Sequence, residues 1–188
     1  GEYVTELATG KQISRSQIGN NVMCFSNAPL SASEAFSSPV SPPPFMVGMA
    51  EVEIDKETGV LELIDYVAVV DCGTVINPNL ARVQVEGGIA QGIGMALYED
   101  VVYNKKGKNF SNSLMQYKIP TRLDVGTIRV EFESSYEPTG PFGAKSIGEI
   151  VINTPSPAIS NAIQNATGVI IRELPMTAEK IYRGISGR

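Results

Sequence analysis

The sequence predicts an α+β fold in which a twisted, mainly antiparallel sheet is flanked by helices. Residues 45–55 and 60–71 each contain alternating apolar and polar positions and are separated by the turn sequence 56–59. Residues 79–101 repeat apolar side chains at three- and four-residue steps, the pattern of a helix. Of the 188 residues, 43% are hydrophobic and 19% are charged, a composition typical of globular proteins.

The chain begins with a segment that differs in composition from the rest. Residues 1–44 are rich in Ser, Asn and Pro, and three consecutive prolines occupy residues 42–44. Consecutive prolines hold the backbone extended and provide no N–H donors. We therefore expect residues 1–44 to form an extended N-terminal arm, and residues 45–188 to form a separate subdomain.

A β-hairpin is the first element predicted in the subdomain. The strand over residues 45–55 leads into Lys56–Gly59, where Gly59 suits the positive φ of a tight turn. Residues 60–71 then form the returning strand. Farther along, residues 127–133 alternate cleanly and predict another strand.

The helix predicted over residues 79–101 has two candidate caps. Asn79 can cap it, or Asn77 can do so with Pro78 in the first helical position. Two further helices are predicted near the C-terminus. One begins at Pro155 with Thr154 as its cap, and a short one begins at Thr177.

The predicted helix over residues 79–101 contains four glycines, each costing about 1 kcal/mol relative to Ala. These are Gly87, Gly88, Gly92 and Gly94. Glycine permits close approach, either by a neighbouring element or by a ligand. Gln84 and Gln91 lie two turns apart on one face and offer amide groups to such a ligand. The pattern alone favours a tightly packed helix over a ligand site.

Composition excludes several kinds of chemistry. The sequence has no histidine, so the commonest general base and metal ligand are missing from it. Its net charge of −5, without a basic stripe, disfavours a nucleic-acid partner, and no apolar run approaches the length of a membrane span. Cys24 and Cys72 are too few to hold an iron–sulfur cluster, and they are expected to be free thiols in a reducing cytoplasm.

Residues 140–154, G-P-F-G-A-K-S-I-G-E-I-V-I-N-T, place several reactive side chains among glycines. Lys145 and Ser146 suggest a phosphate-binding loop, but the glycine spacing does not match the Walker pattern. Glu149 lies between Gly148 and an apolar run, a position that suits a general base. By pattern alone, a surface glutamate that caps backbone amides is favoured over a base.

Three segments, residues 71–78, 83–94 and 143–149, together resemble the molybdenum hydroxylase family. The resemblance is to the C-terminal part of the molybdopterin-binding (large) subunit of xanthine dehydrogenases, and it extends in order from about Pro42 to the end of the chain. Ile150 departs from the family pattern, because many relatives have proline there. The resemblance implies a purine or related heteroaromatic substrate that undergoes oxidative hydroxylation.

The resemblance also implies roles for individual residues. It makes Glu149 the catalytic base and places Gln84 against the pterin cofactor. The glycine-rich helix, with Gly87, Gly88 and Gln91, would let the flat cofactor approach. Two residues just before the base would shape the site, namely Lys145 and Ser146. No side chain of this chain is expected to ligate the metal directly.

The implied cofactor is molybdopterin carrying molybdenum, with its cytosine dinucleotide form left open. Iron–sulfur clusters and FAD would reside on other domains or subunits. The expected partners are the remainder of the molybdenum subunit and the iron–sulfur and flavin subunits of a cytoplasmic oligomer.

The other cofactor-gripping loops of the family have no counterpart in the sequence. We therefore expect the chain alone to bind cofactor poorly and to be inactive. The alternative is a non-catalytic interaction or assembly domain that keeps the fold without the activity.

Overall fold

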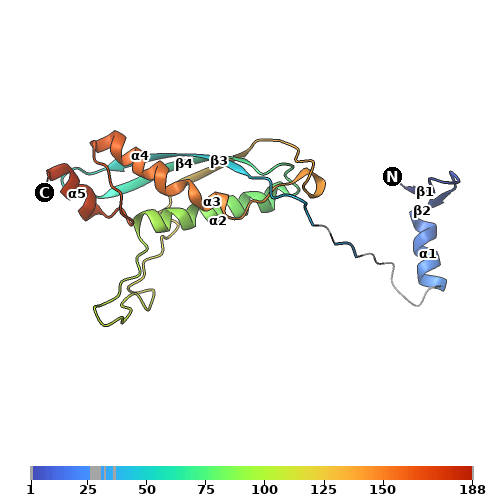
Figure 1. Cartoon of the computed structure of the whole chain (residues 1–188), viewed down its shortest axis with the longest axis horizontal. Coiled ribbons are helices and arrows are strands. Elements are labelled where there is room, and N and C mark those ends of the chain that lie inside the picture. Colours follow the sequence, from blue (N-terminus) through green and yellow to red (C-terminus); the bar gives the residue numbers. More distant parts are fainter. Residues whose placement is uncertain (1, 26–30, 32, 36, 188) are drawn as a thin grey trace. The chain divides into compact units, whose positions relative to one another are not determined.

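The structure is a computed structural model that describes residues 2–25, 31, 33–35 and 37–187. The chain divides into two compact units, residues 1–37 and residues 38–188 (Figure 1).

The first unit contains regular structure where the sequence predicted an extended arm. Strands β1 (Tyr3–Thr5) and β2 (Gln12–Ser14) pair antiparallel, and helix α1 (Arg15–Phe25) follows directly. Within the described part of the chain, α1 buries none of its side chains. A helix without a buried face leaves no apolar period in the sequence, which is why the periodicity analysis missed it. Residues 38–44, by contrast, form neither helix nor strand.

The second unit contains the remaining elements. In chain order they are β3 (Phe45–Ile54), β4 (Leu61–Asp71), α2 (Pro78–Leu97), β5 (Thr127–Phe132), the 3₁₀ turn η1 (Pro141–Gly143), α3 (Ile150–Asn153), α4 (Pro155–Thr167) and α5 (Ala178–Ser186).

The sheet of the second unit has the order β3-β4-β5, and its two strand pairs differ in direction. Strands β3 and β4 form the predicted antiparallel hairpin, with Phe45 opposite Asp71 and with Gly59 in the turn at φ 75°. Strand β5 instead pairs parallel to β4, with Asp65 opposite Thr127. Residues 72–126, which include α2, therefore cross over from one end of β4 to the start of β5. The predicted α+β class is confirmed, in a mixed sheet with flanking helices.

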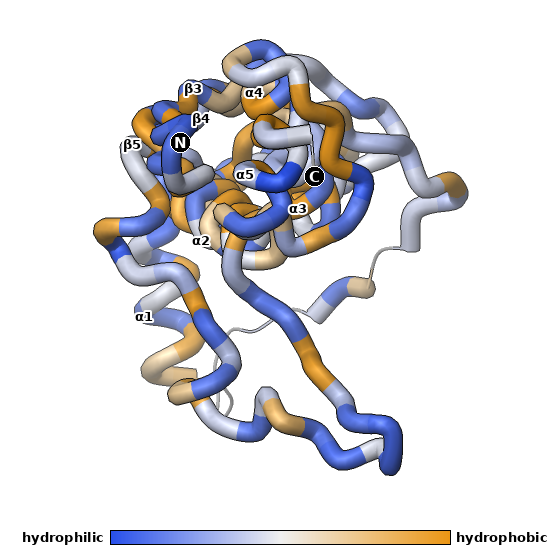
Figure 2. Tube along the Cα trace, turned by 90° about the vertical axis from the view of Figure 1, so that its left-hand side faces the viewer, coloured by the Kyte–Doolittle hydropathy of each residue, from blue (hydrophilic) through white to orange (hydrophobic). Residues whose placement is uncertain are grey.

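One apolar core joins the sheet to α2, α3, α4 and α5. Figure 2 shows apolar segments of these helices gathered in the interior of the unit. Tyr66 of β4 is fully buried, and its hydroxyl donates a hydrogen bond to Thr154 Oγ1 at 2.8 Å. Thr154 occupies the N-cap position of α4 and Pro155 its first turn, as predicted, but the Thr154 side chain makes no capping hydrogen bond. The Thr154 hydroxyl instead accepts the hydrogen bond from Tyr66, a residue far away in the sequence.

Helix α2 ends at Leu97 and not at the predicted residue 101. Tyr98 donates its backbone N–H to the Gly94 carbonyl, and the chain then turns back over Gly94. A Cβ at position 94 would meet the carboxylate end of the flexible Glu99 side chain and lie 3.0 Å from Pro120, so the reversal leaves little space beside Gly94. Among the described residues, no helix combines the length and apolarity needed to cross a membrane.

Candidate functional site

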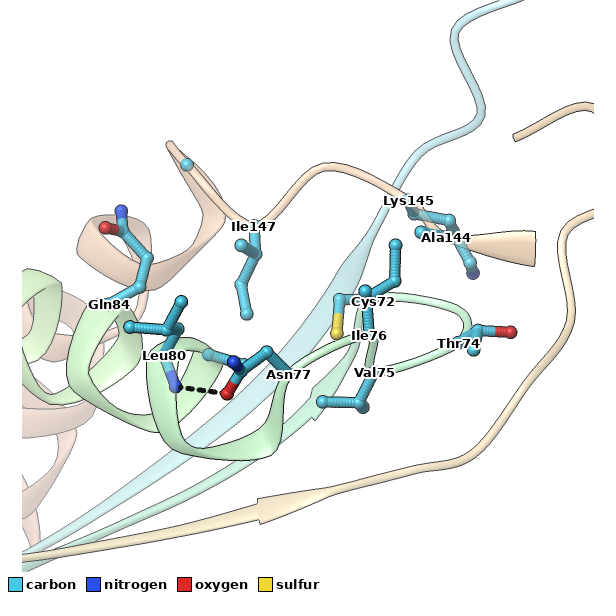
Figure 3. A pocket seen from close by; sticks show the side chains of 12 residues that line it. Cys72, Thr74, Val75, Ile76, Asn77, Leu80, Gln84, Ala144, Lys145 and Ile147 are labelled. Atoms are coloured by element: carbon cyan, nitrogen blue, oxygen red, sulfur yellow. Dashed lines mark hydrogen bonds between the residues drawn. The ribbon is translucent and has the colours of Figure 1, made fainter. Parts of the chain in front are cut away.

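Helix α2 begins close to the end of β4 because Asn77 caps it. The Asn77 side chain accepts a hydrogen bond from the Leu80 N–H at 3.1 Å, and Pro78 occupies the first helical position (Figure 3). This confirms the second of the two predicted caps. The cap fixes where the helix starts, and with it the direction in which each α2 side chain points.

Two of the α2 glycines are needed for packing. A Cβ at Gly88 would lie 2.8 Å from the Cβ of Val151 in α3, and a Cβ at Gly92 would lie 2.6 Å from Pro155 Cγ in α4. Neither site has room for a methyl group, so α3 and α4 approach the α2 backbone directly. At these two positions the tight-packing interpretation of the glycine-rich helix is correct.

Gly87 has no such neighbour. No atom lies within 4 Å of the position its Cβ would take, and Gln84 and Gln91 on the same side of α2 are exposed. This open side of α2 lines a cavity of about 460 Å³. The residues around the cavity come from α2 and from the 148–152 segment: Val83, Gln84, Gly87, Gly88, Gln91, Gly148, Glu149, Val151 and Ile152.

A second cavity, of about 420 Å³, adjoins the first because Gln84 and Gly148 line both. Its wall is largely apolar and is formed by the loop after β4, the first turns of α2 and the 144–148 loop. Figure 3 shows Ile147 lying above the start of α2, with Val75, Ile76 and Leu80 around the opening. Together the two cavities extend along one side of α2.

Glu149 lies at the N-terminal end of α3 but does not cap that helix. Its backbone is helical, with φ −77° and ψ −31°, and its side chain makes no capping hydrogen bond. The structure thus agrees with the alternative interpretation in placing Glu149 on the surface of this chain at a helix start, but not in giving its side chain a capping role. The side chain is exposed within this chain, and it lines the same cavity as Gln84. Ser146 and residues 42–44 border it on another side.

Lys145 is placed differently from the other predicted site residues. Its ammonium group is 2.6 Å from Asp71 Oδ2, only 9% of its side chain is exposed, and it lies 5.3 Å from the centre of the Phe45 ring. Its charge is thus balanced within the chain. Lys145 lines the second cavity but not the cavity that contains Glu149.

Asp71 and Ser135 are two residues of this region to which the sequence analysis assigned no role. Asp71 accepts hydrogen bonds from Lys145 Nζ, from Ser135 Oγ at 2.6 Å and from the Gly73 N–H at 3.0 Å. The bond from Lys145 contributes most, and together the three lower the pKa of Asp71 to about 2. Asp71 lies in one of the segments that carry the family resemblance, but nothing local in the sequence indicates its partners.

Backbone hydrogen bonds join the same two segments. The Lys145 N–H donates to the Cys72 carbonyl at 2.7 Å, and the Thr74 N–H donates to the Gly143 carbonyl at 2.8 Å. Gly73, between them, has φ 68°, and a Cβ there would lie 3.0 Å from the Lys145 nitrogen. Cys72 is buried against this junction, and burial raises the pKa of its thiol.

The open side of α2 fits one face of a flat, polar ring system. Gly87 leaves the backbone accessible, and Gln84 and Gln91 present exposed amides that can donate and accept hydrogen bonds. Four of the six residues predicted to bind cofactor, and the predicted base, thus line one cavity. Lys145 and Ser146 line neighbouring cavities instead.

Comparison with known proteins identifies relatives of this arrangement. A family model described as molybdopterin cofactor-binding domain matches residues 2–126. The probable hypoxanthine oxidase XdhD of Escherichia coli (strain K12) is 37% identical over 146 residues, which are 76% of this chain and 15% of that protein.

Two solved structures are also similar. Quinoline 2-oxidoreductase from Pseudomonas putida 86 superposes with a TM-score of 0.68 at 40% identity, over 73% of this chain and 18% of that one. A Cu,Mo-CO dehydrogenase superposes with a TM-score of 0.81 at 22% identity, over 99% of this chain and 24% of that one, and it supports the fold alone. The chain thus spans less than a quarter of each of these relatives. Because the family model covers well over half of the chain, the protein belongs to the molybdopterin cofactor-binding domain family of the molybdenum hydroxylases.

Proposed function

We propose that this chain supplies one wall of the active site of a molybdenum-dependent enzyme that oxidatively hydroxylates purines or related heteroaromatics. The observation that carries the proposal is that Glu149 shares a cavity with Gln84 and Gly87. The substrate class is supported by two relatives whose names contain hypoxanthine and quinoline, both of which are nitrogen heteroaromatics.

The α2 residues would hold the cofactor. When bound, molybdopterin with its molybdenum supplies the two-electron redox chemistry of the reaction. Gln84 and Gln91 would donate and accept hydrogen bonds to the pterin, and Gly87 would leave the helix backbone open to its approach, whereas Gly88 serves the packing of α2 against Val151.

Glu149 would act as the general base. Its carboxylate would accept the proton released when a ring C–H bond of the substrate is replaced by a C–O bond, a two-electron oxidation for which the bound cofactor would be the electron acceptor. Its freedom from helix capping leaves the carboxylate oxygens available for this transfer. The apolar side chains of the neighbouring cavity, Val75, Ile76 and Ile147, would exclude water from the ring and contact its faces.

The other parts of the enzyme would lie outside this chain. Electrons would leave through iron–sulfur clusters and FAD held elsewhere in an oligomeric complex, since two cysteines cannot ligate a cluster. We also propose that the isolated chain binds cofactor poorly and does not turn over. Metal analysis of the purified chain checks this, and stoichiometric molybdenum together with activity would refute it.

The decisive experiment replaces the proposed base in the assembled enzyme. Glu149→Gln keeps the size of the side chain and removes its basicity, so we expect kcat to fall by about 10²- to 10⁴-fold. Molybdenum content should stay unchanged. Glu53→Gln, on the exposed face of β3, is the matched control and should retain full activity. If Glu149→Gln turned over at the normal rate, the alternative of a non-catalytic assembly domain would be favoured.

A further inference from the structure

We propose that Asp71 is a positioning residue for Glu149, which it places by fixing the 143–148 loop through its ion pair with Lys145. This inference rests on the proposed role of Glu149 as the base. It assigns a function to a carboxylate that lies outside the cavity containing Glu149 and that would not touch cofactor or substrate.

The segment that carries Glu149 is attached to the fold at two places. Upstream, Lys145 is fixed by its side chain to Asp71 and by its backbone N–H to the Cys72 carbonyl. Downstream, Val151 is 1% exposed and packs against Gly88 of α2. Glu149 lies between these two anchors.

The residues between the anchors provide little restraint of their own. A Cβ at Gly148 would meet only Ser146 Oγ, at 3.9 Å, and Ser146 and Gly148 are both exposed. Ile147 is half-buried against the core, but glycine at 148 leaves the backbone free to rotate just before the base. The position of the Glu149 carboxylate therefore depends on how firmly Lys145 and Val151 are held.

The upstream anchor is well placed to be rigid. The Lys145 and Asp71 side chains are only 9% and 21% exposed, so solvent and salt screen their attraction less than that of a surface pair. Two further donors, Ser135 Oγ and the Gly73 N–H, fix the orientation of the Asp71 carboxylate. Removing that carboxylate would leave the Lys145 ammonium mostly buried and without its counter-charge, and the loop would move to solvate it.

The test uses Asp71→Asn in the assembled enzyme. We expect kcat to fall about 10- to 100-fold, because small displacements of a catalytic group have effects of this size, while KM changes by less than about threefold. Molybdenum content should remain that of the parent enzyme. Asp65→Asn is the matched control: it also removes an ion pair from β4, with Arg129, but far from the loop, and kcat should be unchanged.

A double variant separates positioning from a general structural role. In the Glu149→Gln background, Asp71→Asn should slow the enzyme no further, because the loop then has no base to position. Lys145→Arg preserves the charge pair and should retain kcat to within about fivefold. Lys145→Gln removes the same ion pair from its other end and should reproduce the effect of Asp71→Asn. It takes the place of Asp71→Asn if the Asp71→Asn variant does not fold. A further loss in the Glu149→Gln background, or a loss that parallels molybdenum content, would overturn the inference.

The experiment also distinguishes this inference from the proposed function. Full activity in Glu149→Gln would refute the role of the base and the inference with it. Slow turnover in Glu149→Gln combined with full activity in both Asp71→Asn and Lys145→Gln would refute the positioning role alone.

Discussion

The segments on either side of Glu149 are held to the fold by different physical interactions. Upstream, Lys145 is held by an ion pair and by backbone hydrogen bonds to the end of β4. Downstream, Val151 is held by apolar packing against Gly88, where even a methyl group has no room. One candidate base thus depends on two kinds of restraint: the upstream restraint responds to charge and pH, and the downstream one responds to volume.

The largest expected effect comes from adding volume to the downstream anchor. In Gly88→Val, two branched side chains would compete for the same space, since even the Cβ would lie 2.8 Å from the Val151 Cβ. We expect the free energy of unfolding to fall by about 2–3 kcal/mol. Chemical denaturation measures this.

The neighbouring residue provides the control for that substitution. Gly87→Val adds the same side chain on the open side of α2, where no atom lies within 4 Å of the new Cβ. It should cause no loss of stability. Equal losses in the two variants would contradict the assignment of separate packed and open sides to the helix.

The upstream anchor should weaken in acid. The folded-state pKa of Asp71 is lowered to about 2, below its ordinary value of 3.8, so its ionisation stabilises the folded chain above pH 4. That contribution is lost as the pH falls from about 4 to about 2, and it amounts to about 1–2 kcal/mol after allowance for partial exposure. Asp71→Asn should flatten the pH dependence of the unfolding free energy in this window. A slope identical to that of the parent protein would show that the pair adds no stability.

The smallest stability effect is expected on the open side of α2. Gly87→Ala should raise the free energy of unfolding by up to about 1 kcal/mol, because alanine favours a helix and meets no neighbour at this position. In the assembled enzyme the new methyl group would project toward the proposed pterin site, so molybdenum content should fall. A stabilised variant with full molybdenum content would show that the cofactor does not lie against Gly87.

Local patterns predicted several of the elements that frame the site, but not helix α3, which begins directly after Glu149. The β3–β4 hairpin follows from alternation and from the Gly59 turn, and the start of α2 follows from Asn77 and Pro78. Helix α1 was missed because it buries nothing, and the parallel pairing of β5 has no local signal. In each missed case the determining contact is either absent or distant in sequence.

The candidate site likewise contains residues that the sequence indicated and residues whose partners only the structure reveals. Family resemblance led to Glu149, Gln84 and Gly87, which share one cavity, although their roles remain predictions. The Asp71–Lys145 pair joins residues far apart in the chain, and the sequence around Lys145 is equally compatible with a free cation for a ligand. Only the folded structure shows that its charge is already matched.

The parallel pairing of β5 with β4 has a consequence for how the protein folds. The crossover formed by residues 72–126 must close before β5 can join the sheet, and long closures of this kind slow folding. Gln84 precedes β5 in the chain and Glu149 follows it, so the two residues that line the pocket are separated by the end of the crossover and by β5 itself. Forming the pocket therefore requires bringing together residues that are distant in the chain, which should make its assembly slow compared with that of the β3–β4 hairpin.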